Sequence, residues 1–291
     1  MLSILIPIYN FKVVDVVMEL KTQAEKLNIP FEILCFDDAS STHKEANSKL
    51  KNEAHVRYQE LKVNIGRTKI RNLLVEEAKH NNLLFLDCDI TIKKLDFLAA
   101  YAPYFNSGHI VCGGVAYQEE EPTKAQQLRW RYGRKREEKN ASIRNQSPYQ
   151  SFTAFNLLAP KNIFQQIAFN EQIKGYGHED TLFGIELKKD GITVAHIDNP
   201  IIHLGLDENQ TFIQKTEIGL QNLSILIQEN KINKDVKLYR YYLLCKPSLF
   251  LTEFVFTGLR KWCKNRLTKG SNSLLLFDLF KLSYLLTLKA D

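Results

Sequence analysis

The chain has 291 residues, of which 44% are hydrophobic and 25% are charged, and its formal net charge is +6. These values are typical of a globular protein, and they exclude a disordered, collagen-like or fibrous chain. The mild basic excess suits an acidic partner such as a nucleotide or an anionic membrane. Nucleic-acid-binding proteins usually concentrate their basic charge more strongly, so we expect no nucleic-acid partner.

Strands and helices alternate in the first half of the chain. Short apolar runs predict strands, and apolar residues at helical spacing predict helices, in the order strand 3–8, helix 13–27, strand 31–36, a polar helix, strand 56–59, helix 68–79 and strand 83–86. This alternation predicts an α/β fold with a mostly parallel sheet that is flanked by helices on both faces. In such sheets ligands bind beyond the carboxyl ends of the strands. That edge is where Asp37-Asp38 and Asp87-Cys88-Asp89 fall.

The second half begins with a highly charged segment, 119–148, in which we expect a helix over about 123–138. We expect regular structure to resume over 151–158, followed by a helix over 178–190, a strand over 192–197 and a further helix over 211–228. We therefore predict one domain over 1–215 and a helical C-terminal extension over 216–291. Residues 238–291 mix apolar stretches with Lys and Arg, which fits a membrane-binding surface, a packed helical subdomain or a dimer interface.

Two features bear on the cellular compartment. The five cysteines are odd in number and widely spaced, which predicts free thiols and no zinc site. The first apolar run, 1–8, has no basic segment before it, so we expect no secretory signal. We expect a protein of a reducing, cytoplasmic compartment.

The sequence LLFLDCDI places Asp87 and Asp89 directly after an apolar strand. Carboxylates two residues apart on an extended chain point the same way. Their oxygens suit Mg²⁺ or Mn²⁺, which also bridge phosphates of a substrate. The alternative is a pair of solvated acids at a strand end.

The sequence GYGHED opens a predicted helix with Glu179 and Asp180 in its first turn. The helix dipole favours carboxylates there and keeps an acid ionised, as a general base must be. The alternative is simple N-terminal capping of the helix, although capping leaves the two glycines unexplained.

Two further features suit a nucleotide or a metal. Asn64-Ile65-Gly66 leads into a helix that carries Arg67 and Arg71 on one face, a pattern suited to a nucleotide or to a solvated basic surface. His203, in IIHLG, is either a core histidine or the partner of an aspartate in a metal site.

In combination these segments resemble a known family. The order IPIYN (6–10), FDDAS (36–40), NIGRTKIRN (64–72), DCD (87–89) and GYGHED (175–180) resembles the inverting family 2 glycosyltransferases of the GT-A fold. The Glu-Asp pair followed by IIHLG (201–205) is similar to the branch that contains β-1,4-galactosyltransferases and bacterial chondroitin-type polymerases. The resemblance covers roughly 1–215 and implies a Rossmann-like, mostly parallel sheet.

The resemblance implies a nucleotide site at the sheet edge. It implies that Pro7 and Tyr9 line the base pocket, that Asp38 contacts the uracil or the ribose, and that Asn64 and Arg71 lie near the nucleotide.

The resemblance also implies a metal site and a catalytic base. Asp89 and His203 would hold Mn²⁺ or Mg²⁺, and Asp87 would contact the ribose or the metal. Asp180 matches the catalytic base, and Glu179 matches an acceptor-binding carboxylate.

The chain departs from that branch at two positions. Tyr176 and His178 stand where the branch usually has Trp and Gly, which leaves the donor sugar open among galactose, glucose and their N-acetylamino forms. We also expect Trp130, with Arg129 or Arg131, to border the acceptor, or else to form an ordinary solvated helix.

The implied function is metal-dependent, inverting transfer of a sugar from a UDP-sugar to a glycan or lipid-linked glycan in bacterial surface polysaccharide synthesis. The enzyme would be cytoplasmic or peripheral on the inner face of the plasma membrane. One alternative is a non-catalytic sugar-nucleotide-binding module on the same fold. A nucleotidyltransferase would instead show a Gly-rich basic loop near the N-terminus, where this chain has Pro7-Ile8-Tyr9-Asn10.

Overall fold

The computed structural model describes residues 1–173 and 175–288, which divide into two compact units. The first unit comprises Met1–Ala116, Glu138–Glu171 and Phe183–Gly205. The second comprises Tyr117–Glu137, Gln172–Leu182 and Leu206–Asp291. Two segments from the middle of the chain thus join the C-terminal helices. The domain boundary at 215/216 stays a prediction, and the compact units divide at 205/206.

A seven-stranded sheet forms the centre of the first unit, with the strand order β3-β2-β1-β4-β8-β6-β9. The strands are β1 (Leu2–Ile8), β2 (Phe31–Asp37), β3 (Val56–Glu60), β4 (Asn82–Leu86), β6 (Ile110–Cys112), β8 (Asn156–Pro160) and β9 (Val194–His196). Strand β8 runs antiparallel to both of its neighbours, and the other pairs in the sheet are parallel. The predicted α/β class is confirmed.

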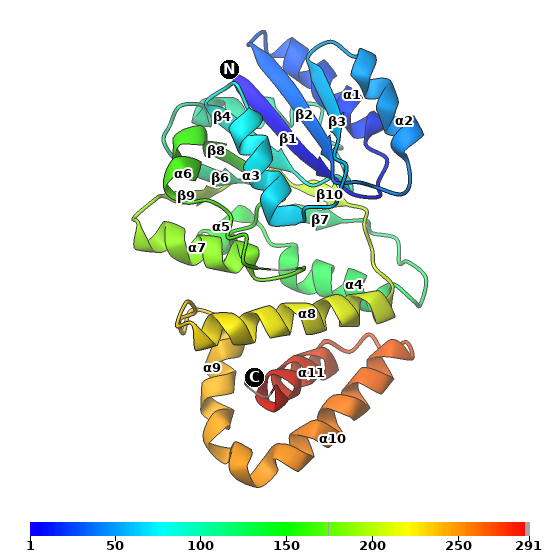
Figure 1. Ribbon diagram of the computed structural model, residues 1–291, viewed down its shortest axis with the longest axis vertical. Coiled ribbons are helices and arrows are strands. Elements are labelled where there is room, and N and C mark those ends of the chain that lie inside the picture. Colours follow the sequence, from blue (N-terminus) through cyan, green and yellow to red (C-terminus); the bar gives the residue numbers. More distant parts are fainter. Residues whose placement is uncertain (174, 289–291) are drawn as a thin grey trace. The chain divides into compact units, whose positions relative to one another are not determined.

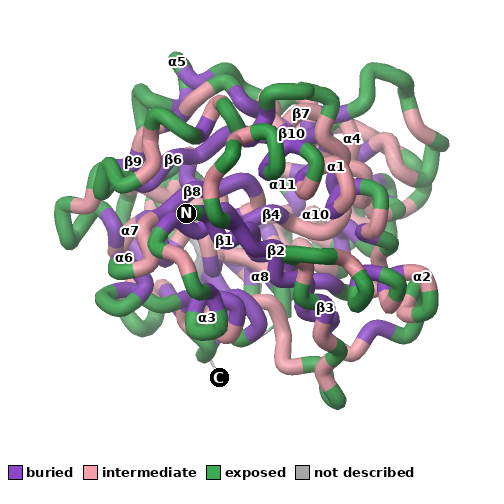
Figure 2. Tube along the Cα trace, turned by 90° about the horizontal axis from the view of Figure 1, so that it is seen from above, coloured by how far each residue is buried: buried purple, intermediate pink, exposed green. Residues whose placement is uncertain are grey.

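The central strands are apolar because both of their faces are covered. Every residue of β2 and β4 is buried, as Figure 2 shows for the middle of the sheet. Helices α1 (Val14–Lys26) and α3 (Arg67–Glu77) lie on opposite faces of these strands (Figures 1 and 2). The apolar stripe of α3, Ile70 and Leu74, packs in one core cluster with Leu5 and Phe36 of the strands.

Shorter elements complete the first unit. They are α2 (Lys44–Ser48), η1 (Lys49–Asn52), η2 (Ala99–Tyr104), α5 (Ala141–Arg144) and α6 (Lys161–Gln166). Helix α7 (Glu179–Lys189) has its first residues, up to Leu182, in the second unit and the rest in the first.

A small second sheet, which the sequence did not predict, joins β5 (Ile90–Thr91), β10 (Ile201–His203) and β7 (Val115–Tyr117). Strand β10 is antiparallel to β5, with His203 opposite Ile90. This register brings two segments more than a hundred residues apart in the sequence together at the end of β4.

The second unit is helical. It contains α4 (Gln127–Tyr132), the π-helical turn η3 (Gly133–Glu137), α8 (Asn209–Gln228), α9 (Lys237–Cys245), η4 (Lys246–Ser248), α10 (Leu249–Thr268) and α11 (Leu274–Thr287). Helix α11 lies between α9 and α10 (Figure 1). In the described part of the chain no helix combines the length and the apolar character needed to span a bilayer.

The helix expected over 123–138 is shorter than predicted. Its α-helical part covers Gln127–Tyr132 and then widens into the π-helical turn η3. Gly133 stands at this change because it lies against the ring of Tyr117, where a Cβ would come within 2.2 Å of Cζ. Only a residue without a side chain allows that approach.

Candidate active site

The carboxyl ends of β1, β2 and β4 meet at one edge of the sheet. Ile8 lies opposite Asp37, and Leu5 lies opposite Phe85. The segments that follow the three strands, which carry Tyr9, Asp38 and Asp87 to Asp89, therefore begin side by side. This edge is where an open α/β sheet binds ligands.

The side chain of Asp38 holds the loop that precedes α3. Its two carboxylate oxygens accept the backbone N–H groups of Ile65, at 2.7 Å, and Gly66, at 2.9 Å. The amide of Asn64 donates to the backbone carbonyl of Asp38 at 3.0 Å. Burial raises the pKa of Asp38, against the lowering effect of the two backbone hydrogen bonds. Its contact with a uracil or ribose stays a prediction.

The loops after β1 and β2 are joined by Asn10, a residue that the sequence analysis did not select. Its side-chain oxygen accepts the N–H of Ser41 at 2.7 Å, and its own N–H donates to Oγ of Ser40 at 2.8 Å. The preceding Tyr9 is 54% exposed, and Pro7 is half-buried at the end of β1. The ring of Tyr9 is therefore accessible, and its role toward a base stays a prediction.

Two arginines on one face of α3 hold Asp87. A guanidinium nitrogen of Arg71 donates to Oδ1 at 2.9 Å, and one of Arg67 lies 3.6 Å from Oδ2. Arg71 is only 1% exposed, and its guanidinium stacks over the ring of Phe169 at 5.4 Å. The predicted basic face thus lies at the DCD segment. The contacts of Asp87 and Arg71 with a nucleotide stay predictions.

Asp89 and His203 meet at the same edge. Nε2 of His203 lies 3.3 Å from Oδ2 of Asp89, and the N–H of Leu204 donates to the carbonyl of Asp89 at 2.8 Å. A Cβ on Gly205 would come within 2.0 Å of Oδ2 of Asp89, so a glycine is needed there. Burial raises the pKa of Asp89, but His203 and Arg67 outweigh burial and hold it below its usual range.

This pair fits a divalent cation. Within the described residues no three Asp, Glu, His or Cys side chains gather as a complete metal site. Mg²⁺, however, commonly takes only one or two protein ligands together with substrate phosphates and water. Ligands at about 2.1 Å in an octahedral shell are about 3 Å apart, close to the separation of Asp89 and His203. The sequence analysis selected both residues but not Gly205, which makes room for the carboxylate.

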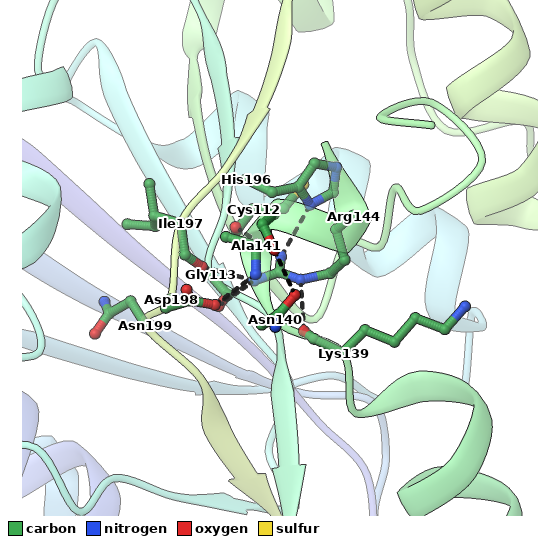
Figure 3. Close-up of polar contacts among 12 residues, drawn as sticks. Cys112, Gly113, Lys139, Asn140, Ala141, Arg144, His196, Ile197, Asp198 and Asn199 are labelled. Atoms are coloured by element: carbon green, nitrogen blue, oxygen red, sulfur yellow. Dashed lines mark hydrogen bonds and ion pairs between the residues drawn. The ribbon is translucent and has the colours of Figure 1, made fainter. Parts of the chain in front are cut away.

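A buried arginine fixes the segment that leads to His203 (Figure 3). The guanidinium of Arg144 donates to the carbonyls of Cys112 and Gly113, both at 3.1 Å, and to that of Ile197 at 2.7 Å. It also donates to the carbonyl of Lys139 at 3.0 Å. The strand end of β6 and the approach to β10 are thus held by one side chain.

His196 completes this network as a neutral imidazole. Because a guanidinium can only donate, Nδ1 of His196 accepts from Arg144 at 2.9 Å, and Nε2 donates to the carbonyl of Pro148 at 3.0 Å. Burial lowers the pKa of His196, and the charge of Arg144 lowers it further. Neither residue was singled out from the sequence, since an isolated Arg and His carry no motif.

The second unit carries Glu179 and Asp180 in the first turn of α7. The side chain of Glu179 is buried and accepts the N–H of Gly177 at 3.0 Å, while Asp180 is half-buried. Both carboxylates therefore lie at the positive end of the helix dipole, as expected. Their roles as acceptor ligand and base stay predictions.

The two glycines before them allow the loop to pack flat on α8. Gly177 has φ of +101°, and a Cβ there would come within 3.0 Å of the Cα of Gly219. The amide of Asn222 donates to the carbonyl of Tyr176 at 3.2 Å. The Gly-Tyr-Gly sequence is thus explained by close helix–loop contact within this unit.

Arg129 and Trp130 make internal contacts in the second unit. Arg129 is buried and donates to Glu137 at 3.1 Å, and Nε1 of Trp130 donates to the carbonyl of Gln118 at 2.8 Å. Their proposed contact with an acceptor stays a prediction.

Comparison with known proteins places this chain in a family. The pattern described as "Glycosyl transferase family 2" matches residues 3–161, more than half of the chain. The chain belongs to glycosyl transferase family 2, and the predicted family is confirmed. No curated protein sequence matched the chain in a separate search.

Solved structures share the fold. The S. aureus TarS 1-349 structure in complex with UDP is 17% identical, with a TM-score of 0.51, and the match covers 76% of this chain and 64% of that one. A mannosyltransferase from Pyrobaculum calidifontis, in complex with GDP-Man and Mn2+, is 13% identical with a TM-score of 0.54, over 78% of this chain and 64% of that one. The match thus spans less than two thirds of either structure. The GT-A fold is confirmed, while the branch within the family stays a prediction.

Proposed function

We propose that the chain transfers a sugar from a UDP-sugar to an acceptor hydroxyl, with inversion at the anomeric carbon and with the help of a divalent cation. The observation that carries this proposal is the approach of Asp89 to His203, 3.3 Å apart at the ligand-binding edge of a family 2 chain. Support for a nucleotide donor and a cation comes from the fold neighbours, one bound to UDP and the other to GDP-Man and Mn2+.

Asp89 and His203 would hold the cation, which when bound neutralises negative charge on the diphosphate leaving group. Arg71 and Arg67 hold the carboxylate of Asp87 in place, and its remaining lone pairs can accept hydroxyl groups of the ribose. Tyr9 offers an exposed ring to the base. These are the roles that the family resemblance implies, and the chemistry of each group suits its role.

Asp180 would remove the proton from the acceptor hydroxyl. That oxygen then attacks the anomeric carbon from the face opposite UDP, the bond to the diphosphate breaks, and an α-linked donor yields a β-linkage. Asp180 stands in the first turn of α7, where the helix dipole favours a negatively charged side chain. A positioned base contributes about 10²–10⁴-fold to such a step.

The test is UDP release from a panel of UDP-sugars with Mn²⁺, in the presence of glycan acceptors. We expect Asp180→Asn to lose about 10²–10⁴-fold in turnover while UDP still binds. The matched control is Asp190→Asn, at an exposed residue just after the same helix, which should keep full turnover. Near-normal turnover of Asp180→Asn would contradict the base. Binding of UDP-sugars without any turnover by the wild type would favour the non-catalytic alternative.

We further propose that the C-terminal helices rest on an anionic membrane, as suits a lipid-linked acceptor in bacterial polysaccharide synthesis. Residues 237–288 carry nine Lys or Arg and two Asp or Glu, a net charge of +7. This exceeds the net charge of the whole chain, which is +6. Phe254 and Trp262, eight residues apart on one face of α10, are 90% and 55% exposed, and Leu244 of α9 is 76% exposed. Exposed apolar residues beside basic ones favour the surface of an anionic bilayer.

Vesicle sedimentation tests this surface. We expect binding to vesicles that contain phosphatidylglycerol but not to pure phosphatidylcholine, and loss of binding in Phe254→Asp. Leu95→Asp, at an equally exposed site of the first unit, is the control. Absence of binding to either vesicle, or concentration-dependent dimers abolished by Phe254→Asp, would contradict membrane association.

A further inference from the structure

The second unit contains a cavity of about 290 Å³. Its walls come from the α4–η3 segment, the loop of residues 176–178 and the helices α8, α9 and α11. Four aromatic side chains line it, namely Tyr132, Tyr176, Phe212 and Phe277. Its volume is at the lower end of small-molecule sites, which begin at about 300 Å³, and suits a single ring with its substituents.

Charged side chains also line the cavity. The ammonium groups of Lys215 and Lys281 line the cavity, and each is already paired, with Asp207 at 2.7 Å and with Asp278 at 2.9 Å. An ammonium has three N–H donors, so a paired lysine can still donate to a ligand. The carboxylate of Glu137 also lines the cavity and accepts from Arg129 at 3.1 Å.

Two polar groups of the wall have no hydrogen-bond partner among the residues that the structure describes. They are the hydroxyl of Tyr132 and Nε2 of His178, whose Nδ1 lies 3.3 Å from Oγ1 of Thr181. Burial lowers the pKa of His178 to about 4, so the imidazole is neutral at physiological pH. Depending on the tautomer, Nε2 can then donate or accept a hydrogen bond. Polar groups at a cavity wall need a partner, from water or from a ligand.

The composition of the wall selects the class of ligand. An anion would meet the carboxylate of Glu137, and a cation would meet Lys215 and Lys281. A purely apolar ligand would leave the hydroxyl of Tyr132 and the imidazole of His178 without partners, which is costly. A neutral ring with hydroxyl groups satisfies both the polar groups and the aromatic faces, because each hydroxyl can donate and accept.

We propose that this cavity binds one neutral pyranose unit of a glycan, a second sugar site contributed by the helical unit. The loop that lines it, residues 176–178, continues directly into Glu179 and Asp180. The inference rests on the proposed glycosyltransferase function in one respect, namely that the sugar belongs to the acceptor chain. If this loop holds one sugar of the acceptor chain, the protein recognises its acceptor by a sugar unit that is distinct from the sugar being transferred.

Saturation-transfer NMR tests the site, with the whole chain, no nucleotide, and the methyl pyranosides of glucose, galactose and their N-acetylamino forms as probes. We expect at least one pyranoside to bind the wild type. Tyr132→Phe keeps the ring and removes one hydrogen bond, so binding should weaken about threefold to tenfold. Thr216→Phe introduces a ring into the cavity and should abolish binding. Tyr284→Phe, on α11 but outside the cavity wall, is the matched control and should bind like the wild type.

Thermal unfolding of each variant confirms that it is folded before its binding is compared. The proposal is overturned if no pyranoside binds, if Tyr132→Phe and Thr216→Phe bind like the wild type, or if inorganic phosphate displaces the sugar more effectively than another sugar does. UDP binding with Mn²⁺ is measured on the same samples. A protein that binds UDP but no pyranoside overturns this inference alone, and one that binds pyranosides but no UDP-sugar overturns the proposed donor instead.

Discussion

The segments after β2 and β4 both begin with acidic residues, but the structure binds them in different ways. The carboxylate of Asp38 accepts two backbone N–H groups, at 2.7 and 2.9 Å. The carboxylates of Asp87 and Asp89 contact charged or titratable side chains instead, Arg71 at 2.9 Å and His203 at 3.3 Å. Backbone partners fix a loop, whereas a carboxylate that contacts a side chain keeps lone pairs with which it can accept from a ligand.

This difference in partners shows that a carboxylate at the ligand-binding edge does not by its position alone bind a ligand. The partners of each carboxylate divide the edge into a supporting half, the Asp38 loop, and a reactive half, the DCD segment. Three substitutions test this division and a fourth tests the neutral imidazole of His196, in order from the largest expected effect to the smallest.

Replacing Arg71 by Met should destabilise the fold most. The guanidinium is 1% exposed and pairs with Asp87, so its loss leaves a carboxylate without its main partner. We expect about 3–5 kcal/mol from urea unfolding. Arg57→Met is the control, because its ion pair with Glu77 is exposed and should contribute less than about 1 kcal/mol. Equal effects of the two substitutions would contradict a buried anchor at Arg71.

Replacing Asp89 by Asn should affect turnover more than stability. The amide is a poor ligand for a cation, and we expect about a hundredfold loss of turnover, or about 2.7 kcal/mol. The unfolding free energy should change by less than about 1 kcal/mol, because the His203 contact is long and partly exposed. Asp96→Asn, at an exposed site nearby, controls for the change of charge. Full turnover of Asp89→Asn would contradict a reactive role for the DCD segment.

Replacing Asp38 by Asn should do the reverse and destabilise the fold. One oxygen can still accept, but the amide nitrogen then faces a second backbone N–H. The lost charge-assisted hydrogen bond is expected to be worth about 1.5–3 kcal/mol in thermal unfolding. Asp15→Asn, whose carboxylate is 84% exposed, should change almost nothing. If Asp38→Asn keeps its stability but loses UDP binding, Asp38 binds the ligand and does not mainly support the loop.

The smallest expected effect is on the pH dependence of stability. Burial lowers the pKa of His196 below the value near 6.5 of an unfolded histidine, so between the two values the unfolded chain binds more protons. The contribution of His196 to the free energy of unfolding is therefore fully present above about pH 6.5. It is lost as the pH falls below about 6.5, by at most about 1.4 kcal/mol per pH unit. His196→Gln should flatten the dependence between pH 7.5 and 5, and His109→Gln, at an exposed site, should not. An unchanged slope in His196→Gln would contradict a neutral imidazole.

The sequence predicted the alternating elements of the first unit because central parallel strands are apolar along their whole length, as β2 and β4 are. It could not predict β5 and β10, which are two and three residues long and exist only through their pairing. For the same reason it selected Asp89 and His203 but could not predict their approach, which depends on the register of that pairing.

Local spacing also missed what depends on distant partners. Arg144 and His196 lie in no motif, and their importance comes from the backbone carbonyls around them. The glycines of GYGHED suggested more than capping, and the contacts of Gly175 with Ile218 and of Gly177 with Gly219 explain them. The cavity wall draws on segments from residue 132 to residue 281, which no sequence window joins.

The most direct test of the central claim is a calorimetric titration of UDP into the wild type and into Asp89→Asn, each with Mn²⁺ and with EDTA. If Asp89 and His203 hold a cation that receives the diphosphate, the wild type binds UDP much more tightly with Mn²⁺, and Asp89→Asn loses that gain while staying folded. UDP affinity that is equal with Mn²⁺ and EDTA in the wild type, or a metal-dependent gain that survives in Asp89→Asn, would contradict the proposed site.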